Sequence, residues 1–451
     1  MTDTIVAQAT PEGISALAVI RVSGNLTKGL LLEACNLPHP TPRHAYYKRY
    51  LDLNGNSPDQ IIVTYFESGK SFTSESSIEI ICHGNPIIVN EIISDLLARG
   101  CRIADPGEFT FRAYQNGKID LIQAEAIAEL ISAKSRRALE LANKNLNGNL
   151  TETIREIQQN ILIQQAEIEA FIDFPEDDLG EEQNSKIIIE LDLIQSKIIN
   201  LIKISKRIDI FNRKLNVVLI GPPNAGKSSI FNKIVGSERA IVDINPGTTR
   251  DFINHTVNLE DLEFELYDTA GIRENAKDIE KIGIRKSEEI LRIADLIVMV
   301  LDASQPYPTK FEKQIEEIIS TEKVLIVLNK NDLQQKLNSQ SLPNILKDMI
   351  YTSTNNYESI EKLIGEIKVK LHKNFEIKKE FNVSVNLRQS NLLKLALIPL
   401  KSCIAKLNNQ IEIELCVPDL KESIDKLSEI AGEKNNEDML DVLFSSFCIG
   451  K

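Results

Sequence analysis

The chain has 451 residues and a mass of 50.6 kDa, more than one hydrophobic core normally covers, so we expect two to four domains. Its 42% hydrophobic and 26% charged residues are typical of a soluble globular protein. No window of about 18 apolar residues is present, and the N-terminus resembles neither a secretory signal nor a transit peptide. We therefore predict a cytoplasmic protein that does not span a membrane.

The net charge is −13, so the protein as a whole does not attract the negatively charged backbone of nucleic acid. Any contact with RNA must come from a local basic patch or from a partner. The six cysteines form no C-x-x-C pair, which argues against a zinc site or a disulfide framework and fits a reducing compartment. They are Cys35, Cys82, Cys101, Cys403, Cys416 and Cys448.

Residues 1–117 alternate short β-type runs with turns. Residues 14–22 and 77–82 are apolar and rich in β-branched side chains, which predicts strands. Residues 88–98 are typical of a helix that ends near Gly100. We interpret this region as a small α/β domain.

Residues 118–213 change to helical periodicity. Apolar residues recur there at spacings of three and four, as at Ile122, Ala126 and Leu130, and again from residue 154 to 172. Pro175 and Gly180 interrupt the pattern, which resumes over residues 187–208. Residues 385–451 are also helical in pattern, with Leu392, Leu395, Leu400 and Ile404 among the apolar positions.

Between these helical regions lies an α/β segment. Its strand-like runs are separated by helix-length stretches, which is typical of a parallel sheet covered by helices. The runs are residues 215–220, 262–267, 296–301 and 324–328. The simplest arrangement is one helical domain made from both flanks, with the α/β domain inserted; two separate helical domains are the alternative, which we disfavour because it is less compact.

A phosphate-binding loop begins the α/β segment. Residues 221–228, G-P-P-N-A-G-K-S, match the pattern G-x-x-x-x-G-K-S/T and stand between a strand and a helix, as the motif requires. The glycines allow backbone N–H groups to face phosphate, Lys227 reaches the β- and γ-phosphates, and the Ser228 hydroxyl ligates Mg²⁺. The predicted nucleotide contacts in this loop are Asn224, Ala225, Gly226, Lys227, Ser228 and Ser229.

Two further segments complete a Mg²⁺ and γ-phosphate site. Asp268, at the end of a strand, can hold Mg²⁺ through water, and the Gly271 backbone N–H can meet the γ-phosphate. Thr249 is our candidate for a second Mg²⁺ ligand, in a loop that the γ-phosphate would order as a switch. The intervening residues Thr269 and Ala270 are predicted to contact the nucleotide as well.

Residues 329–332, N-K-N-D, predict selection of guanine. The Asp332 carboxylate can accept two hydrogen bonds from the N1–H and exocyclic amine of guanine, a donor pair that adenine lacks. Asn329 and Lys330 accompany it, although the same four residues also suit an ordinary polar turn. Ile272, at the position where Ras-like enzymes place a water-orienting glutamine, cannot orient water, so another group must act in hydrolysis.

Over essentially its full length, the sequence resembles the tRNA-modification GTPase family called MnmE or TrmE. Segments in the α/β region resemble the P-loop and both switches of that family: residues 224–229, 246–251, 268–274 and 279–285. Segments outside it are more specific: residues 3–10, 106–112 (P-G-E-F-T-F-R), 116–126 and 444–451.

The resemblance implies four chain segments: a folate-binding and dimerisation domain at 1–117, helical parts at 118–213 and 374–451, and a P-loop GTPase domain at 214–373. It implies that 5-formyl- or 5,10-methylene-tetrahydrofolate binds at Arg21, Glu79, Lys118 and Lys451. Cys448 matches the C-terminal cysteine of the family and is a candidate reactive thiol. From the residues alone, Arg21 and Lys118 also suit a solvated surface, and Glu79 suits a carboxylate at a strand edge.

The resemblance also implies K⁺ in place of an arginine finger. Its ligands would be Asn224, Asp243, Asn245 and Thr248, and the catalytic glutamate would be Glu280, acting through water. The further nucleotide contacts implied are Ile244, Pro246, Gly247, Ser353 and Thr354.

Two departures from the family pattern stand out. The usual Phe/Tyr-Thr-Gly-Glu-Asp before the folate glutamate appears here as residues 72–77, F-T-S-E-S-S. The usual Ser-Ala-Lys guanine loop appears as Ser353, Thr354 and Asn355, a change that a backbone contact to guanine tolerates.

The function that the resemblance implies is GTP hydrolysis within a complex that modifies C5 of the wobble uridine of certain tRNAs. The chain would form a homodimer and join an FAD-dependent partner of the MnmG family in a heterotetramer. A ribosome-assembly switch and a purely regulatory GTPase are the alternatives. The first is disfavoured because no G-x-x-G RNA-binding module follows the GTPase segment, and folate binding would discriminate against the second.

Overall fold

The computed structural model describes residues 3–133, 135–173, 181–212, 215–236, 253–259, 262–268, 293–306, 323–337, 349–374, 382–409, 413–434, 437–445, 447 and 450. The chain forms two compact units. The first comprises Met1–Ala128, Asn145–Lys197 and Asn391–Lys451, and the second comprises Glu129–Lys144 and Ile198–Ser390.

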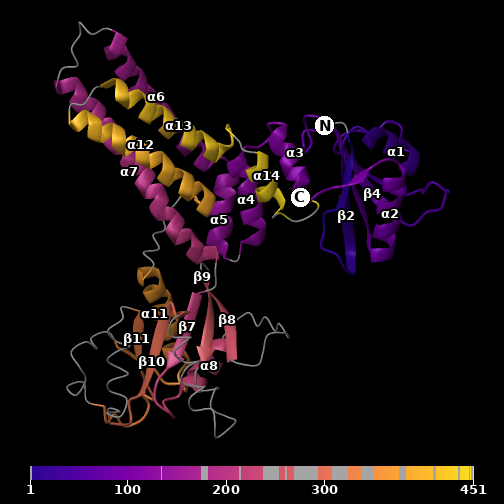
Figure 1. Ribbon diagram of the computed structural model, residues 1–451. Helices are drawn as coiled ribbons and strands as arrows, with labels where there is room; N and C mark the ends of the chain where they lie inside the picture. The colour runs from indigo at the N-terminus through magenta and orange to yellow at the C-terminus, as the bar shows by residue number, and fades with distance from the viewer. Residues whose placement is uncertain are drawn as a thin grey trace, which may run out of the picture. The chain divides into compact units, whose positions relative to one another are not determined.

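A mixed sheet opens the first unit (Figure 1). Its order is β3-β4-β5-β2-β1-β6, and neighbouring strands are antiparallel except for β1 and β6. The strands are β1 (Ile5–Gln8), β2 (Ser15–Ser23), β3 (Ala45–Arg49), β4 (Gln60–Phe66), β5 (Ser77–Gly84) and β6 (Arg102–Ile103). The strands predicted at 14–22 and 77–82 correspond to β2 and β5.

Helices α1 (Thr27–Cys35) and α2 (Pro86–Ala98) cover one face of this sheet and form its core. Alternate residues of β2 and β5, such as Ile20 and Ile80, point into that core and are about 1% exposed or less. Because strand side chains alternate between faces, the residues next to them, Arg21 and Glu79, belong to the opposite face. Helix α3 (Glu108–Gln115) follows β6.

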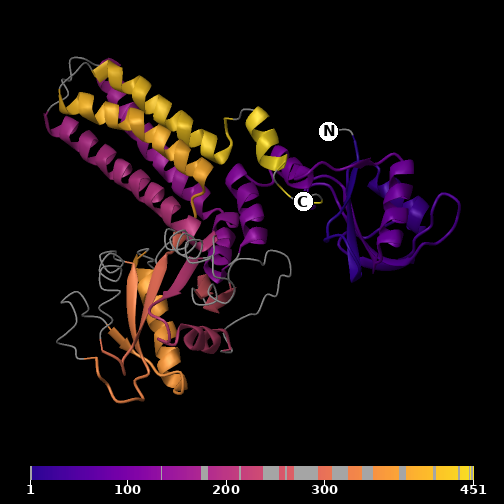
Figure 2. The same cartoon turned by 60° about the horizontal axis from the view of Figure 1, so that its bottom comes forward.

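Long helices complete the first unit, and Figures 1 and 2 show α6, α7, α12 and α13 side by side. Helices from both ends of the chain meet there: the Gln158 amide of α6 donates a 2.9 Å hydrogen bond to Ser428 of α13. One helical domain built from two chain segments is therefore confirmed. Its helices are α4 (Leu121–Ser132), α6 (Asn149–Asp173), α7 (Glu181–Asn212), α12 (Leu387–Asn408), α13 (Cys416–Ala431) and α14 (Glu437–Ser445). Residues 129–132 of α4, 198–212 of α7 and 387–390 of α12 belong to the second unit.

The apolar faces predicted for these helices are largely buried, including Ile154, Ile161 and Leu400 at 0% exposure. Leu395, however, is 46% exposed and does not belong to the core, because it lies on the opposite side of α12 from Leu393 and Ala396. The exact domain boundaries that the sequence suggests stay predictions.

The second unit contains a six-stranded sheet of order β12-β11-β10-β7-β9-β8. Its strands are β7 (Leu215–Ile220), β8 (Ile253–Leu259), β9 (Leu262–Asp268), β10 (Leu296–Asp302), β11 (Val324–Asn329) and β12 (Met349–Tyr351). Helices α5 (Arg136–Leu146), α8 (Lys227–Val235) and α11 (Tyr357–Asn374) belong to this unit, and α8 and α11 contribute to its core.

Five of these strands are parallel, as predicted, but β8 pairs antiparallel with β9, in register Leu259 to Leu262. The four strands that the sequence predicts are parallel to one another, whereas β8, which it does not predict, adds an antiparallel edge. Strands β8 and β9 are separated by only two residues, and such a short connection can join antiparallel strands but not parallel ones.

Among the helices that the structure describes, none is long and apolar enough to span a membrane. Cys35, Cys82, Cys101, Cys403 and Cys416 are buried free thiols, whereas Cys448 lies outside the described residues.

The loop between β4 and β5 contains a strained serine. Ser74 has a φ of 65°, in the left-handed region that favours glycine, and its carbonyl accepts the Gly69 N–H at 2.8 Å. The MnmE pattern has glycine at this position. The serine therefore adopts a backbone conformation that glycine would adopt freely, and it does so at a conformational cost.

We predict that Ser74→Gly raises the free energy of unfolding by about 0.5–1 kcal/mol, because it removes the strain of the left-handed conformation. The greater conformational entropy of glycine in the unfolded chain offsets only part of this gain. Urea denaturation of the full chain measures the change. Ser57→Gly, at an exposed loop position without a positive φ, should lower stability instead. An equal effect of both substitutions would contradict the strain at Ser74.

Candidate functional site

Those predicted polar residues of the second unit that the structure describes gather at one edge of its sheet. They follow the carboxyl ends of β7, β9, β11 and β12, which all point the same way because these strands are parallel. This edge is the usual ligand-binding edge of an open α/β sheet. The structure thus brings together segments that lie more than 130 residues apart in the sequence, such as those of Gly221 and Thr354.

The loop from Gly221 to Gly226 wraps in a conformation that needs its particular residues. Gly221, Asn224 and Gly226 have φ values of 145°, 63° and 95°. A side chain at Gly221 would meet the Val300 carbonyl oxygen at 2.0 Å, and one at Gly226 would meet the Asn329 amide at 2.2 Å. The loop therefore forms a cradle that tolerates no added β-carbon at these two positions.

Lys227 and Ser228 begin helix α8 inside this cradle. The Lys227 ammonium donates to the Gly221 and Pro222 carbonyls at 2.9 Å each, and its side chain is buried. The Ser228 hydroxyl donates a 2.6 Å hydrogen bond to Asp268, which is 4% exposed at the end of β9. A hydroxyl and a carboxylate that meet beside the positive end of a helix form a donor set suited to hydrated Mg²⁺.

Asn329 and Lys330 hold the cradle from the next loop. The Asn329 amide, 1% exposed, donates to the Ala225 carbonyl at 2.9 Å, and the Lys330 ammonium donates to the Asn224 carbonyl at 2.8 Å. Both contacts join the loop after β11 to the loop after β7.

Asp302, at the end of β10, accepts a 2.7 Å ion pair from Lys330. Burial alone would raise the pKa of Asp302, but hydrogen bonds from Lys330 and Ser304 outweigh it and hold the pKa below its usual range. We did not predict this residue from the sequence. Its position at the carboxyl end of a buried parallel strand was the signal that could have identified it.

Asp332 presents an exposed carboxylate at the same edge. Hydrogen bonds from Ser353 and Asn355 hold its pKa below the usual range, so the group is ionised at neutral pH. The Asn355 amide lies 3.0 Å from one of its oxygens. The carboxylate is thus held in place, and it remains open to solvent.

A cavity of about 550 Å³ lies beside these residues. Ser229 and Thr354, both predicted nucleotide contacts, line it together with Lys233 and Asn355. Its volume falls within the range of pockets that hold small organic ligands.

The remaining predicted contacts lie outside the described residues. They are Asp243, Ile244, Asn245, Pro246, Gly247, Thr248, Thr249, Thr269, Ala270, Gly271, Glu280, Cys448 and Lys451.

Two predicted residues of the first unit meet on the open face of its sheet. Arg21 of β2 and Glu79 of β5 are directly paired in register, and the guanidinium donates to a single Glu79 oxygen, Oε1, from Nε at 3.1 Å and from Nη2 at 2.9 Å. Both side chains are about one-third exposed or less. Glu79 lies mid-sheet, between β4 and β2, and not at a strand edge.

Arg21 also lies between two aromatic rings, with its guanidinium carbon 5.8 Å from the centroids of both Phe72 and Phe109. Lys118 is exposed just beyond α3, and the structure gives no contact between its side chain and this pair. Within the described residues, no group of three or more His, Cys, Asp or Glu side chains could hold a metal ion.

Comparison with known proteins identifies the family. Residues 4–118 match the model of the GTP-binding protein TrmE N-terminus, and residues 121–448 match that of the MnmE helical domain. The chain belongs to the MnmE family. It is a GTPase, a GTP-binding enzyme of tRNA modification.

Three curated relatives of this MnmE protein are each called tRNA modification GTPase MnmE. Those from Opitutus terrae and Aquifex aeolicus are 38% and 37% identical, and that from Thermotoga maritima is 35% identical. All of this chain is covered in each case, with 99% of the first relative and all of the other two. Among solved structures, the G domain of the T. maritima FeoB iron transporter matches 36% of this chain and 99% of that chain, at 24% identity and a TM-score of 0.27, too low to support an argument.

We predict that Asp302→Asn accelerates release of guanine nucleotide about fivefold, because Lys330 loses its ionic partner and holds the Asn224 carbonyl less firmly. Stopped-flow release of a fluorescent GDP analogue measures the rate. Asp295→Asn is the control: Asp295 is 5% exposed, while the Asp302 side chain is 13% exposed, and Asp295 precedes β10, at the opposite edge of the sheet. Equal rates in both variants would argue against a role for Asp302.

Proposed function

We propose that this MnmE-family GTPase hydrolyses GTP at the carboxyl edge of the second sheet, within a complex that modifies C5 of a wobble uridine in tRNA. The added aminomethyl or carboxymethylaminomethyl group would take its one-carbon unit from a tetrahydrofolate bound to the first unit. The observation that carries the nucleotide site is the cradle at Gly221–Gly226, tied to Asn329 and Lys330 by side-chain hydrogen bonds.

GTP would lie across the cradle with its base toward Asp332. The Asp332 carboxylate is ionised, exposed and oriented by Asn355, so it can accept both donors of guanine. Adenine would leave the carboxylate unsatisfied. The Ser353 and Thr354 loop and the neighbouring cavity would then border the base and ribose.

The phosphates would meet the backbone N–H groups of residues 224–229 and the Lys227 ammonium. Lys227 now binds two loop carbonyls, and its transfer to phosphate oxygens exchanges neutral acceptors for charged ones. Ser228 and Thr249 would ligate Mg²⁺, with Asp268 placed behind Ser228.

Asn224, Asp243, Asn245 and Thr248 would hold K⁺. When bound, Mg²⁺ and K⁺ neutralise the charge that develops on the transferring phosphoryl group. Glu280 would orient the attacking water through a second water, a role that Ile272 cannot fill. The remaining residues of the switch loops, Ile244, Pro246, Gly247, Thr269, Ala270 and Gly271, would contact the nucleotide.

The folate would bind on the open face of the first sheet, at Arg21 and Glu79. Among the contacts of the described residues, Glu79 uses only Oε1 and Arg21 uses only Nε and Nη2. One carboxylate oxygen and one guanidinium nitrogen therefore remain for the donor and acceptor edge of a pterin. Lys118 and Lys451 would meet the glutamate tail, and Cys448 would be a reactive thiol nearby.

The chain would divide into a folate-binding domain at 1–117, helical segments at 118–213 and 374–451, and a GTPase domain at 214–373. It would form a homodimer through the first of these and work in the cytoplasm with an FAD-dependent MnmG-family partner in a heterotetramer. Since the net charge is −13, most of the attraction for tRNA would come from that partner or from a local basic patch.

GTP turnover by the purified chain should be at least tenfold faster in KCl than in NaCl of equal ionic strength, and Glu280→Ala should lower it about a hundredfold. Phosphate release measures both effects. Glu289→Ala, a nearby acidic residue outside the motif at 279–285, should leave turnover unchanged. Turnover indifferent to the cation and to Glu280 would remove the hydrolytic assignment and favour a ribosome-assembly switch.

Glu79→Ala should weaken binding of 5-formyltetrahydrofolate about tenfold or more, because it removes the carboxylate that faces the pterin and frees Arg21. Isothermal titration calorimetry of the full chain measures the dissociation constant. Glu91→Ala, on the exposed side of α2, is the control and should bind as the parent does. Equal affinity in the Glu79 variant would place the folate elsewhere.

A further inference from the structure

The loop of residues 67–76, between β4 and β5, borders the Arg21–Glu79 pair. Its Phe72 ring lies 5.8 Å from the Arg21 guanidinium carbon and is 37% exposed. The most buried side chains of the loop are polar: Ser71 is 3% exposed and Thr73 is 1% exposed. Hydrophobic burial therefore contributes little to its order, and polar contacts must hold it.

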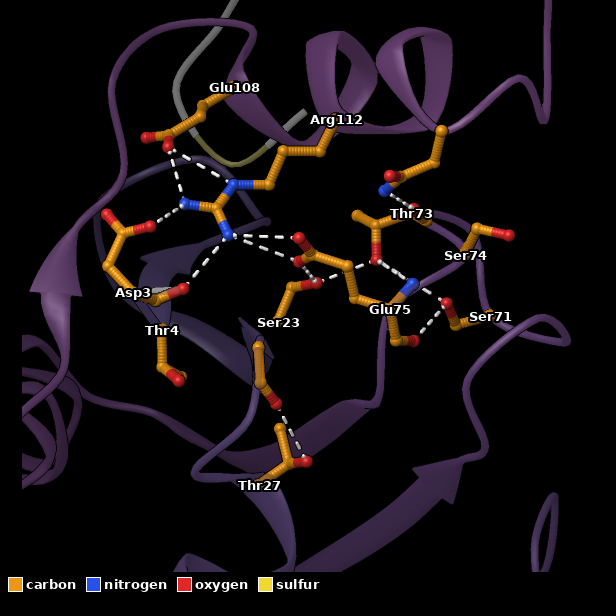
Figure 3. A network of polar contacts seen from close by, with 12 residues as sticks. Asp3, Thr4, Ser23, Thr27, Ser71, Thr73, Ser74, Glu75, Glu108 and Arg112 are labelled. Carbon is orange, nitrogen blue, oxygen red and sulfur yellow. Dashed lines mark hydrogen bonds and ion pairs between the residues drawn. The ribbon is translucent and has the colours of Figure 1, made fainter. Parts of the chain in front are cut away.

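A buried guanidinium supplies the strongest of these contacts (Figure 3). Arg112 of α3 is 1% exposed and binds three carboxylates, Glu108 at 2.9 Å, Asp3 at 3.0 Å and Glu75 at 3.2 Å. Burial would lower the pKa of Arg112, but Glu108 and Glu75 more than offset it and keep the group charged. Of these three partners, only Glu75 belongs to the loop.

Glu75 also forms hydrogen bonds with other residues of the loop and with β2. One of its carboxylate oxygens accepts the Ser23 hydroxyl at 2.7 Å, and its backbone N–H donates to Thr73. The Ser71 hydroxyl donates to the Glu75 carbonyl at 2.5 Å, so Phe72 lies between two anchored residues. Figure 3 shows these groups converging on Glu75 below Arg112.

A second restraint reaches the loop from the turn after α3. The Asn116 amide donates a 2.7 Å hydrogen bond to the Thr73 carbonyl. Asn116 is exposed and lies two residues before Lys118, the predicted folate cation. Helix α3 and the turn after it therefore tie the loop to the segment that bears Lys118.

We propose that Arg112 is a positioning residue for the one-carbon donor site, which holds Phe72 over Arg21 through Glu75, with Asn116 as a second anchor. The inference rests on the proposed folate function and adds to it the group that orders the site. Arg112 itself is too buried to touch a ligand on the open face of the sheet. The aromatic ring it positions would cover a planar pterin beside the Arg21–Glu79 pair.

The test uses Glu75→Gln and Asn116→Ala in the full chain, because these two residues bind the loop directly, whereas removal of Arg112 would also disturb its contacts with Asp3 and Glu108. Titration calorimetry with 5-formyltetrahydrofolate should show affinity about fivefold weaker in each variant. Hydrogen exchange of residues 67–76 should accelerate while that of α2 does not. Asn90→Ala and Glu91→Gln, on the exposed side of α2, should match the parent chain in both measurements.

A double-mutant cycle separates positioning from a general loss of stability. If Glu75 acts by placing Phe72, Glu75→Gln should have no further effect on affinity in a Phe72→Ala background. If the effects of Glu75→Gln and Phe72→Ala on affinity are fully additive, the inference is overturned. It is also overturned if Glu75→Gln and Asn116→Ala both bind folate as the parent does. Either result leaves the proposed folate site unchanged. Absence of folate binding by the parent chain would overturn the proposed folate function and the inference with it.

Discussion

The loop after β7 keeps its shape because the side chains of Asn329 and Lys330 bind its carbonyl oxygens. Six residues that include two glycines would otherwise sample many conformations, and these bonds, together with those from Lys227 to the Gly221 and Pro222 carbonyls, remove that freedom. Gly226 has no room for a β-carbon beside the Asn329 amide, so each segment determines which residue the other can carry. The segment proposed to select guanine and the loop proposed to bind phosphate thus hold each other in place.

The same principle operates in the first unit with different chemistry. There the loop of residues 67–76 lacks an apolar anchor, and a buried arginine with three carboxylates holds it to α3. Buried ion pairs contribute little net stability, since desolvation offsets most of their Coulombic gain. Their value here is geometric: Arg112 defines one position for Glu75, and through it one position for Phe72.

Ser74 illustrates how such a network tolerates a departure from the family pattern. Serine in the left-handed region is unfavourable by itself, but its carbonyl accepts the Gly69 N–H, and Thr73 and Glu75 on either side are anchored. The surrounding contacts therefore impose the turn that glycine would adopt freely.

The amino-acid sequence by itself determined the fold class, because hydrophobic periodicity distinguishes the α/β segments from the long helices and because the phosphate loop is a contiguous motif. It also pointed to Asp268 and Asn329, which the structure places at the carboxyl edge of the second sheet, since each ends a strand-like apolar run. The tertiary structure alone decided the antiparallel edge strand β8, the exposure of Leu395, the ion pair between Asp302 and Lys330, and the convergence of Asp3, Glu75 and Glu108 on Arg112. These features depend on which residues of distant segments come within about 3 Å of each other, and spacing along a chain carries no information about such a distance until the segments have packed.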